Sequence, residues 1–236
     1  MARKLDGLTA FFPAYNEEAH IATTIESARK ILPRVAKKWE ILIINDGSKD
    51  KTGKIADKLA NSDKRIKAIH HLQNRGYGAA LRSGMYGAKY EWVVFTDADG
   101  QFDFSEVSHF IETQYKSNAD MVIGYYKSRQ VPLYRKINTF GWQFVVFLLF
   151  GLKVRDIDCA FKLFRKSVVD TIEPLESERG AFISSEFLIK SKKAGFSIKE
   201  IGITHMPRRA GSGTGANLNV IVKSFIDLFK LWLKLR

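Results

Sequence analysis

Residues 92–101 read WVVFTDADGQ, and this stretch combines two features from which the rest of the sequence can be interpreted. Its first half, residues 92–96, is an apolar run with the length and composition of a buried strand. Its second half places Asp97 and Asp99 on either side of one alanine, directly where that strand would end. The stretch therefore predicts a strand that brings two carboxylates to one edge of a sheet.

Similar apolar runs recur through the first half of the chain, with helical patterns between them. The strand candidates are residues 8–12, 40–45, 66–71, 92–96 and 121–124. Helical periodicity is found in residues 17–32, 50–61, 76–88 and 105–116. Because strands that alternate with helices form parallel pairs, the pattern predicts an α/β fold with a mainly parallel, Rossmann-like sheet and helices on both faces.

Three polar loops follow the first, second and fourth of these strands. They read PAYNEE at 13–18, NDGS at 45–48 and TDADGQ at 96–101. Each loop alone is explained by local structure, since Asn16 and Ser48 are good N-cap residues and Asp46 precedes a glycine in a common turn pair. Ligands of open parallel sheets bind beyond the carboxyl ends of the strands, so the three loops together favour a binding site.

Asp97 and Asp99 also form a candidate metal site. Two carboxylates at a buried strand end repel each other unless a cation lies between them, and Mg²⁺ or Mn²⁺ prefers oxygen ligands of this kind. Gln101 offers a third oxygen two residues later. The alternative, that both acids serve only as turn and cap residues, does not explain why the two charges stand together. A Mg²⁺ or Mn²⁺ site at Asp97, Asp99 and Gln101 is therefore expected.

Composition and charge narrow the class of protein. Of the 236 residues 45% are hydrophobic, and 38 basic against 25 acidic residues give a net charge of +13. We expect one packed domain with a polyanionic partner, which is a nucleic acid, an anionic membrane surface or a phosphorylated small molecule. The single cysteine, Cys159, excludes an internal disulfide and a cysteine-based zinc site.

Five motifs occur in a fixed order along the chain. They are PAYNEE, NDGS, NRGYGAALRSG, DADGQ and DIDCAFKLFRK. In order and spacing the chain resembles the family 2 glycosyltransferases, which have the GT-A fold, over residues 8–213. Within that family it is most similar to the polyprenyl-phosphate sugar synthases, the group that contains dolichyl-phosphate mannose and glucose synthases. The resemblance implies transfer of a sugar from a nucleotide-diphosphate donor to a polyprenyl phosphate.

The resemblance also implies roles for particular residues. In the family the first two loops hold the base and ribose, and the two acids with the following glutamine bind the cation and the diphosphate. Carried over to this chain, the nucleotide-sugar site would consist of Pro13, Tyr15, Glu17, Asp46, Asp97, Ala98, Asp99 and Arg208. The cation, bound by Asp97, Asp99 and Gln101, would neutralise the charge of the departing diphosphate.

Three further residues are expected on the acceptor side as catalytic candidates. Arg135 resembles a family arginine near the phosphates, although a solvated surface arginine explains it equally well. Asp158 falls where this subgroup of the family carries an acid facing the acceptor side, and Glu186 lies on a helix whose family counterpart lines the same cleft, so either is a candidate general base. Because a lipid phosphate has a second pKa of about 6 and is largely dianionic at neutral pH, the reaction can also proceed without a base.

The motifs depart from the family pattern in two places. Many relatives carry an arginine where this chain has Tyr126, and Lys127 or Arg129 would have to replace it. In the loop RRAGSGT at 208–214 a threonine stands where a lysine is usual, so the phosphate contact of that loop is not transferred. These departures leave the donor sugar and its base unassigned.

The last 20 residues, 217–236, are expected to form an amphipathic helix that follows a GT-A domain of residues 1–216. One narrow polar stripe is formed by Asn219, Lys223, Asp227, Lys230 and Lys234. A basic amphipathic helix with aromatic residues is typical of a membrane interface, and a core helix or a dimer seam is the alternative. No secretory signal is seen, and the longest apolar run, 140–152, is too short for a transmembrane helix.

These observations predict an inverting, metal-dependent glycosyltransferase that lies peripherally at the cytoplasmic face of a membrane. Its partners would be a nucleotide-diphosphate sugar, a polyprenyl (dolichyl or undecaprenyl) phosphate and an anionic membrane surface, and a homo-oligomer or a membrane partner protein stays open. The alternative is a family 2 glycosyltransferase with a saccharide or other soluble acceptor. A nucleic-acid-binding module would also explain the charge, but helix-turn-helix, RNP and zinc signatures are missing, so no nucleic acid partner is expected.

Overall fold

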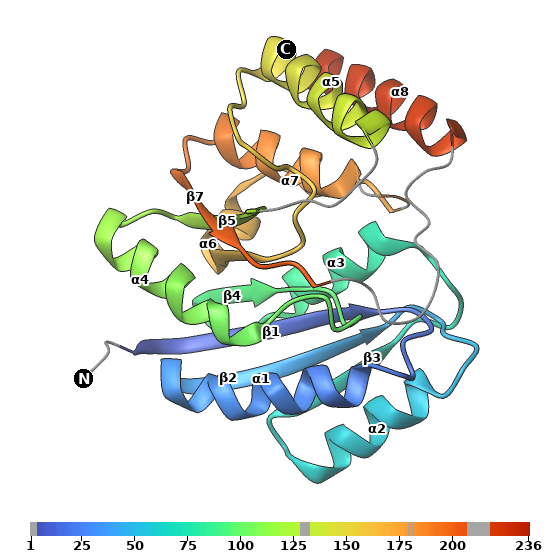
Figure 1. Ribbon diagram of the computed structural model, residues 1–236, viewed down its shortest axis with the longest axis vertical. Coiled ribbons are helices and arrows are strands. Elements are labelled where there is room, and N and C mark those ends of the chain that lie inside the picture. The colour runs from blue at the N-terminus through green and yellow to red at the C-terminus, as the bar shows by residue number, and fades with distance from the viewer. Residues whose placement is uncertain (1–3, 128–132, 179, 181, 207–217) are drawn as a thin grey trace.

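The computed structural model describes residues 4–127, 133–178, 180, 182–206 and 218–236, with only the backbone described at 133–138 and 218–222. Its strands are β1 (Leu5–Ala14), β2 (Ala36–Asn45), β3 (Ile66–His70), β4 (Trp92–Phe95), β5 (Met121–Tyr126), β6 (Lys162–Arg165) and β7 (Ile198–Ile203). They form one sheet in the order β3-β2-β1-β4-β6-β5-β7 (Figure 1). Every pair is parallel except the two made by β6, so the mainly parallel sheet is confirmed.

The helices occupy the connections between strands, as the periodicity predicted. They are α1 (Ile21–Val35), α2 (Thr52–Ser62), α3 (Tyr77–Gly87), α4 (Val107–Ser117), α5 (Leu133–Phe150), α6 (Lys166–Thr171), α7 (Phe182–Lys193) and α8 (Leu218–Lys234), with a short 3₁₀ turn η1 (Phe104–Glu106) before α4. The apolar residues of α1 that were expected on one face, among them Ile21, Ile25 and Leu32, are fully buried. Burial of such a face, more than intrinsic propensity, stabilises a helix of this length.

Helices cover both faces of the sheet. Consecutive residues of a strand point to opposite faces, so each strand supplies side chains to both layers of packing. Phe11 of β1 stacks on Phe95 of β4 with ring centroids 5.0 Å apart, and α3 packs over this side. The next residue, Phe12, points to the opposite face and packs at 5.6 Å against Phe104 of η1, which contacts α1 and α4.

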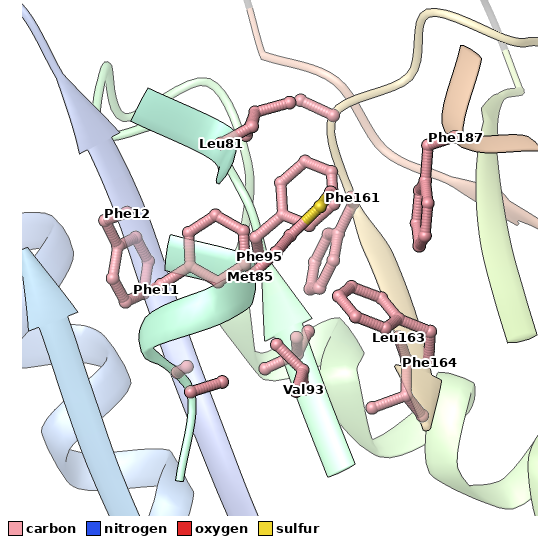
Figure 2. Packing of buried hydrophobic residues seen from close by; sticks show 14 of the residues in the cluster. Phe11, Phe12, Leu81, Met85, Val93, Phe95, Phe161, Leu163, Phe164 and Phe187 are labelled. Carbon is pink, nitrogen blue, oxygen red and sulfur yellow. The ribbon is translucent and has the colours of Figure 1, made fainter. Parts of the chain in front are cut away.

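A chain of aromatic rings continues this core from the centre of the sheet to α7 (Figure 2). The ring of Phe95 lies 6.4 Å from that of Phe164 in β6, which lies 5.0 Å from that of Phe187 in α7. On the other face Phe161 stacks on Phe110 of α4 at 4.4 Å. Because each buried ring contributes about 1.5–3 kcal/mol, these contacts fasten the antiparallel strand β6 between the helices of both faces.

The strand register brings four loops to one edge of the sheet. Ala14 pairs with Asn45, so β1 and β2 end side by side, and Phe11 pairs with Phe95 at the end of β4. Lys162 also pairs with Phe95, but in the antiparallel direction, so β6 begins at the edge where the others end. The loops after β1, β2 and β4 therefore meet the turn that precedes β6.

The strands β6 and β7 were not predicted from the sequence. β6 has only four residues and begins with a charged one, Lys162, which is completely buried. β7 lies at the edge of the sheet and carries Lys199 and Glu200, so it lacks the apolar run of a central strand. Short strands and edge strands are hard to recognise in a sequence, because they are too short or too polar to form a clear apolar run.

The helices α5 and α8 lie side by side as an outer layer beyond α7 (Figure 1). Trp142 of α5 contacts Phe225 of α8 with ring centroids 5.1 Å apart, and its indole nitrogen donates a 3.1 Å hydrogen bond to Ser185 of α7. The outer surface of this layer exposes Phe140, Phe144, Phe147 and Leu148 of α5 and Phe225, Ile226, Phe229 and Leu233 of α8. Among the described helices, none combines the length and the apolar character needed to cross a bilayer.

Close packing of α3 on the sheet gives a test of this architecture. A Cβ atom at Gly84 would overlap the ring of Phe11, whereas one at Gly87 in the same helix would meet Leu42 at an ordinary 3.6 Å. Gly84→Ala should lower the free energy of unfolding by about 1–3 kcal/mol through overpacking. Gly87→Ala should leave it unchanged or raise it slightly. Urea denaturation of both variants measures the difference, and equal stabilities would contradict the packing of α3 described here.

Candidate active site

The loops after β1 and β2 are joined by hydrogen bonds into one unit. The backbone nitrogen of Asn16 donates to Ser48 Oγ at 3.0 Å, and Asn16 Oδ1 accepts from the backbone nitrogen of Lys49 at 2.8 Å. The next residue, Glu17, donates its backbone nitrogen to Thr52 Oγ1 at 2.8 Å. Asn16 adopts a left-handed conformation with φ 56°, which asparagine tolerates better than most residues. The two polar loops that the sequence singled out therefore form a rigid surface.

The predicted nucleotide residues of the first loop have different environments. Pro13 is buried within β1, next to Ile44 of β2, and can offer only a wall of the site. Tyr15 is 42% exposed at the start of the loop, where its ring is accessible to a ligand. Glu17 is partly buried and lies 3.5 Å from the ring of His20 at the beginning of α1. Their assignment to the nucleotide stays a prediction.

Asp46 organises the loop before α3. Its Oδ1 accepts from His71 Nδ1 at 2.6 Å and from the backbone nitrogen of Arg75 at 2.9 Å. Its Oδ2 accepts from Asn74 Nδ2 at 3.0 Å and from the backbone nitrogen of Gly76 at 2.8 Å. A carboxylate has about four lone-pair sites, so this buried group is saturated. It fixes the path of residues 71–76, and a direct contact with a nucleotide base would require one of these donors to leave.

Asp97 and Asp99 lie beyond the end of β4, as predicted. Tyr77, the first residue of α3, donates its hydroxyl to Asp97 Oδ1 at 2.9 Å, and the backbone nitrogen of Gln101 donates to Asp99 Oδ1 at 3.1 Å. Burial, followed by the charge of Asp99, raises the pKa of Asp97 to about 7. A cation bound beside these two carboxylates would favour the ionised form of Asp97. The alanine between them, Ala98, is buried and accepts a 3.3 Å hydrogen bond from Thr24 through its carbonyl.

Gln101 is held in place by the segment that follows β7. Its side-chain nitrogen donates to the carbonyl of Met206 at 3.0 Å, and its own carbonyl accepts from the backbone nitrogen of Met206 at 2.8 Å. The amide nitrogen is thus engaged, and the amide oxygen is the atom that a cation would use. No cluster of three His, Cys, Asp or Glu residues suited to a metal is found in the described residues. The set of two acids and one amide fits Mg²⁺ or Mn²⁺ bound together with substrate phosphates, which complete such sites.

Lys162 is a residue of this edge that sequence reasoning missed. Its side chain is completely buried, and its ammonium donates to the carbonyls of Ile157, at 3.1 Å, and Cys159. Burial lowers its pKa, and the nearby acids Asp156, Asp158 and Asp97 oppose that effect. The signal in the sequence was that Lys162 follows four residues after Asp158, the second acid of the DIDC motif.

The turn around Lys162 carries Asp158, which was predicted as a candidate base. Asp156 Oδ1 accepts from the backbone nitrogens of Asp158, at 3.0 Å, and Cys159, at 3.2 Å. Asp158 is partly exposed at the same edge of the sheet as Asp97, since the ammonium of Lys162 senses both charges. The structure thus brings Asp158 and the proposed metal ligands to one edge, and the catalytic role of Asp158 stays a prediction.

Glu186 does not have the environment expected of a general base. It is 2% exposed, and it accepts from Lys190 Nζ at 2.7 Å and from the backbone nitrogens of Glu176 and Ser177 at 2.8 and 2.9 Å. Burial alone would raise its pKa, but the hydrogen bonds from Lys190, Ser177 and Glu176 outweigh it and hold the pKa below the usual value. The carboxylate ties α7 to the preceding loop, and this makes it a poor proton acceptor.

Two predicted residues lie outside the described part of the molecule. Arg208 falls in the segment 207–217, which the structure does not describe. Arg135 falls within α5, of which only the backbone is described at that position. Their predicted contacts with the phosphates therefore remain predictions from the sequence.

Comparison with known proteins agrees with this arrangement. The model of a family described as "Glycosyl transferase family 2" matches residues 9–173. The chain is 31% identical to the uncharacterized protein MJ1222 of Methanocaldococcus jannaschii, over 96% of this chain and 91% of that protein. It is 30% identical to human dolichyl-phosphate beta-glucosyltransferase, over 74% of this chain and 60% of that enzyme. One similar solved structure is glucosyl-3-phosphoglycerate synthase from Mycobacterium tuberculosis in complex with Mn²⁺, UDP and phosphoglyceric acid. It superposes with a TM-score of 0.73 at 16% sequence identity and covers 96% of this chain and 78% of that one.

The raised pKa of Asp97 predicts how stability depends on pH. An acid whose pKa is higher in the folded state than in the unfolded state costs stability as the pH rises through the folded value of about 7. In the presence of a chelator, the melting temperature of the wild type should therefore fall relative to Asp97→Asn between about pH 5 and pH 8. Addition of Mn²⁺ at pH 8 should stabilise the wild type more than the variant. Parallel pH curves for the two proteins would contradict the shift.

The environment of Glu186 predicts a structural and not a catalytic effect of its loss. Glu186→Gln leaves Lys190 buried without its charge partner, so the free energy of unfolding should fall by about 3 kcal/mol. Well below the melting temperature, kcat should fall by much less than the ~10²-fold or more that loss of a general base causes. Denaturation and steady-state kinetics of one preparation measure both. A stable variant with a ~10²-fold lower kcat would restore the base role.

Proposed function

Because the chain belongs to glycosyl transferase family 2, we propose that it transfers one sugar from a nucleotide-diphosphate donor to a polyprenyl phosphate. Membership makes it a glycosyltransferase with the GT-A fold, in the group of polyprenyl-phosphate sugar synthases. The proposal goes further and names the donor, the metal dependence and the acceptor. A bound Mg²⁺ or Mn²⁺ would neutralise charge on the diphosphate as it departs.

The observation that carries the proposal is the pair of carboxylates beyond β4, next to the joined loops. Burial and the neighbouring charge of Asp99 disfavour ionisation of Asp97, and a cation that a diphosphate ligand brings or shares would offset this. The unit formed by the loops after β1 and β2 borders this edge and offers the exposed ring of Tyr15. We assign the nucleoside to these loops and the diphosphate to the acids, with Gln101 as the third oxygen ligand.

The proposed reaction is a direct displacement at the anomeric carbon. An oxygen of the acceptor phosphate forms the new bond on the side opposite the diphosphate, the old bond to the diphosphate breaks, and the diphosphate oxygen keeps the electron pair. The configuration at that carbon is inverted. A phosphate with a second pKa of about 6 carries no proton that must be removed at neutral pH. The low pKa and complete engagement of Glu186 agree with a reaction that does not use it as a base.

We further assign the exposed face of α5 and α8 to the membrane that holds the acceptor, on its cytoplasmic side. Contiguous aromatic and aliphatic side chains on this face are rare on soluble monomers and typical of interaction sites. Two exposed lysines of α8, Lys223 and Lys230, add attraction to anionic lipid, whereas Lys234 is paired with Glu176. Residues 217–236 would then act as an interfacial helix that is packed on the catalytic domain, as Leu228 and Leu231 are buried.

The experiment that tests this function is transfer of labelled sugar from a panel of UDP- and GDP-sugars to a short polyprenyl phosphate. Asp99→Asn should abolish metal-dependent transfer, because the cation loses one carboxylate ligand. Asp103→Asn is the matched control, since it removes an exposed acid four residues later while keeping a side-chain oxygen for the helix cap to Ser105. Its activity should equal that of the wild type.

Each outcome of this assay has a distinct meaning. A lipid product that needs Mg²⁺ or Mn²⁺ and disappears in Asp99→Asn supports the proposal and identifies the donor. A product formed only with a soluble acceptor such as phosphoglyceric acid would retain the fold and the donor site but overturn the lipid acceptor. Equal losses in the two variants would show that net negative charge, and not the metal site, is responsible.

A further inference from the structure

A hollow of about 230 Å³ lies between the end of β5, the first half of α5 and the segment before the DIDC turn. Its described lining includes Tyr125, Tyr126, Phe140, Gln143, Arg155 and Asp156. Aromatic rings thus form much of its wall, and Arg155 is the basic residue among those that line it. A hollow that combines aromatic walls with a guanidinium suits a ligand that is anionic at one end and apolar at the other.

Arg155 is fixed in position by three elements. Its backbone nitrogen donates to Glu200 Oε1 of β7 at 2.6 Å, and its carbonyl accepts from Gln143 Nε2 of α5 at 2.6 Å. Its guanidinium lies 4.6 Å from the ring centroid of Tyr125 of β5, in cation–π contact. The residue is exposed, and in the described part of the molecule no carboxylate forms an ion pair with the guanidinium. A held but unpaired guanidinium can bind an incoming anion with little loss of side-chain entropy.

The hollow shares a wall with the proposed diphosphate site. Tyr126 stacks on Phe102 at 6.2 Å and lies edge-on to His205 at 4.5 Å. Phe102 directly follows the proposed metal ligand Gln101. The acid in the lining, Asp156, turns its carboxylate to the backbone nitrogens of the DIDC turn, so part of its negative charge is compensated there. Tyr126 thus connects the lining of the hollow with the segment that carries the proposed metal ligand Gln101.

On its other side the hollow opens onto the apolar face of α5. Phe140 lines the hollow and is 71% exposed, and Phe144, Phe147 and Leu148 continue along the same helix in the outer layer (Figure 1). The volume of about 230 Å³ is below the ~300–1,000 Å³ of pockets that enclose a whole drug-sized ligand. The hollow would therefore hold the head of a long amphiphile and leave its chain on the surface of α5.

We propose that this hollow binds the phosphate end of the polyprenyl phosphate, with Arg155 as the phosphate ligand and Phe140 at the start of the hydrocarbon path. The inference rests on the proposed function and adds a binding residue to it. Many relatives carry an arginine where this chain has Tyr126, and Arg155 would supply that positive charge instead. The stacked arrangement with Tyr125 presents the planar guanidinium to two phosphate oxygens, a geometry that lysine does not reproduce.

The test compares Arg155→Met and Arg155→Lys with Lys153→Met in transfer to farnesyl phosphate. Lys153 is the matched control because it is a basic, exposed residue of the same segment that is not part of the lining. Arg155→Met should raise KM for farnesyl phosphate about 10- to 100-fold, the effect of losing a hydrogen bond to a charged group. Arg155→Lys should recover part of this loss. In all three variants KM for the donor and the rate of donor hydrolysis should match those of the wild type.

A second variant examines the hydrocarbon path. Phe140→Ser should raise KM for farnesyl phosphate while leaving KM for a phosphorylated one-isoprene alcohol unchanged, because only the longer chain reaches along α5. The side chains of Arg155 and Phe140 are both exposed, so the circular dichroism spectra and melting temperatures of their variants should match those of the wild type.

The possible results separate failure of this inference from failure of the proposed function. If the wild type transfers sugar to farnesyl phosphate but Arg155→Met has an unchanged acceptor KM, the assignment of Arg155 is wrong and the function stands. An equal rise in Lys153→Met would overturn the assignment in favour of a general charge effect. If the wild type does not use any polyprenyl phosphate, the proposed function and this inference fall together.

Discussion

The buried ammonium of Lys162 is the constraint on which the arrangement of the site depends. A lysine that is removed from water must find oxygen partners or lose its proton. Lys162 finds the carbonyls of Ile157 and Cys159, so the chain before β6 has to wrap around its side chain. This wrapping brings Asp158 to the edge where β4 delivers Asp97 and moderates the repulsion among the acids there. The contacts of this one charge therefore stabilise the turn at residues 157–162, from which β6 runs antiparallel to β4.

The parts of the fold that the sequence predicted are those with long, regular patterns. β1 and β2 were predicted because they are clear apolar runs, and α1 because its apolar residues repeat with the helical period. β6 was missed because it begins with a residue type that is almost never fully buried. Asp46 was recognised as a loop acid, but its four donors come from residues 25–30 positions later, which only the topology brings close. Glu186 and Lys190 lie four residues apart on one helix, and from that spacing their ion pair could have been predicted.

The donor and acceptor sites proposed for this chain lie on different parts of the fold. At 16% identity the superposition with glucosyl-3-phosphoglycerate synthase, whose complex contains phosphoglyceric acid, reports a shared fold and nothing about the acceptor of this chain. In this chain the central strands and the joined loops form a rigid base. The elements α5 and α8 carry the exposed aromatic side chains, with exposed lysines beside them on α8, and the chemistry of the acceptor would be selected there.

The hydrogen bonds that join the loops after β1 and β2 have a consequence for the catalytic cycle. Since Asn16, Glu17 and their partners Ser48 and Thr52 are already ordered, the nucleoside pocket proposed there does not need to close around a ligand. The nucleoside diphosphate left after sugar transfer would then meet the same surface as the intact donor. It would compete with fresh donor for that surface, so product inhibition would be built into the fold, and sustained turnover would depend on an activity elsewhere that removes the nucleotide.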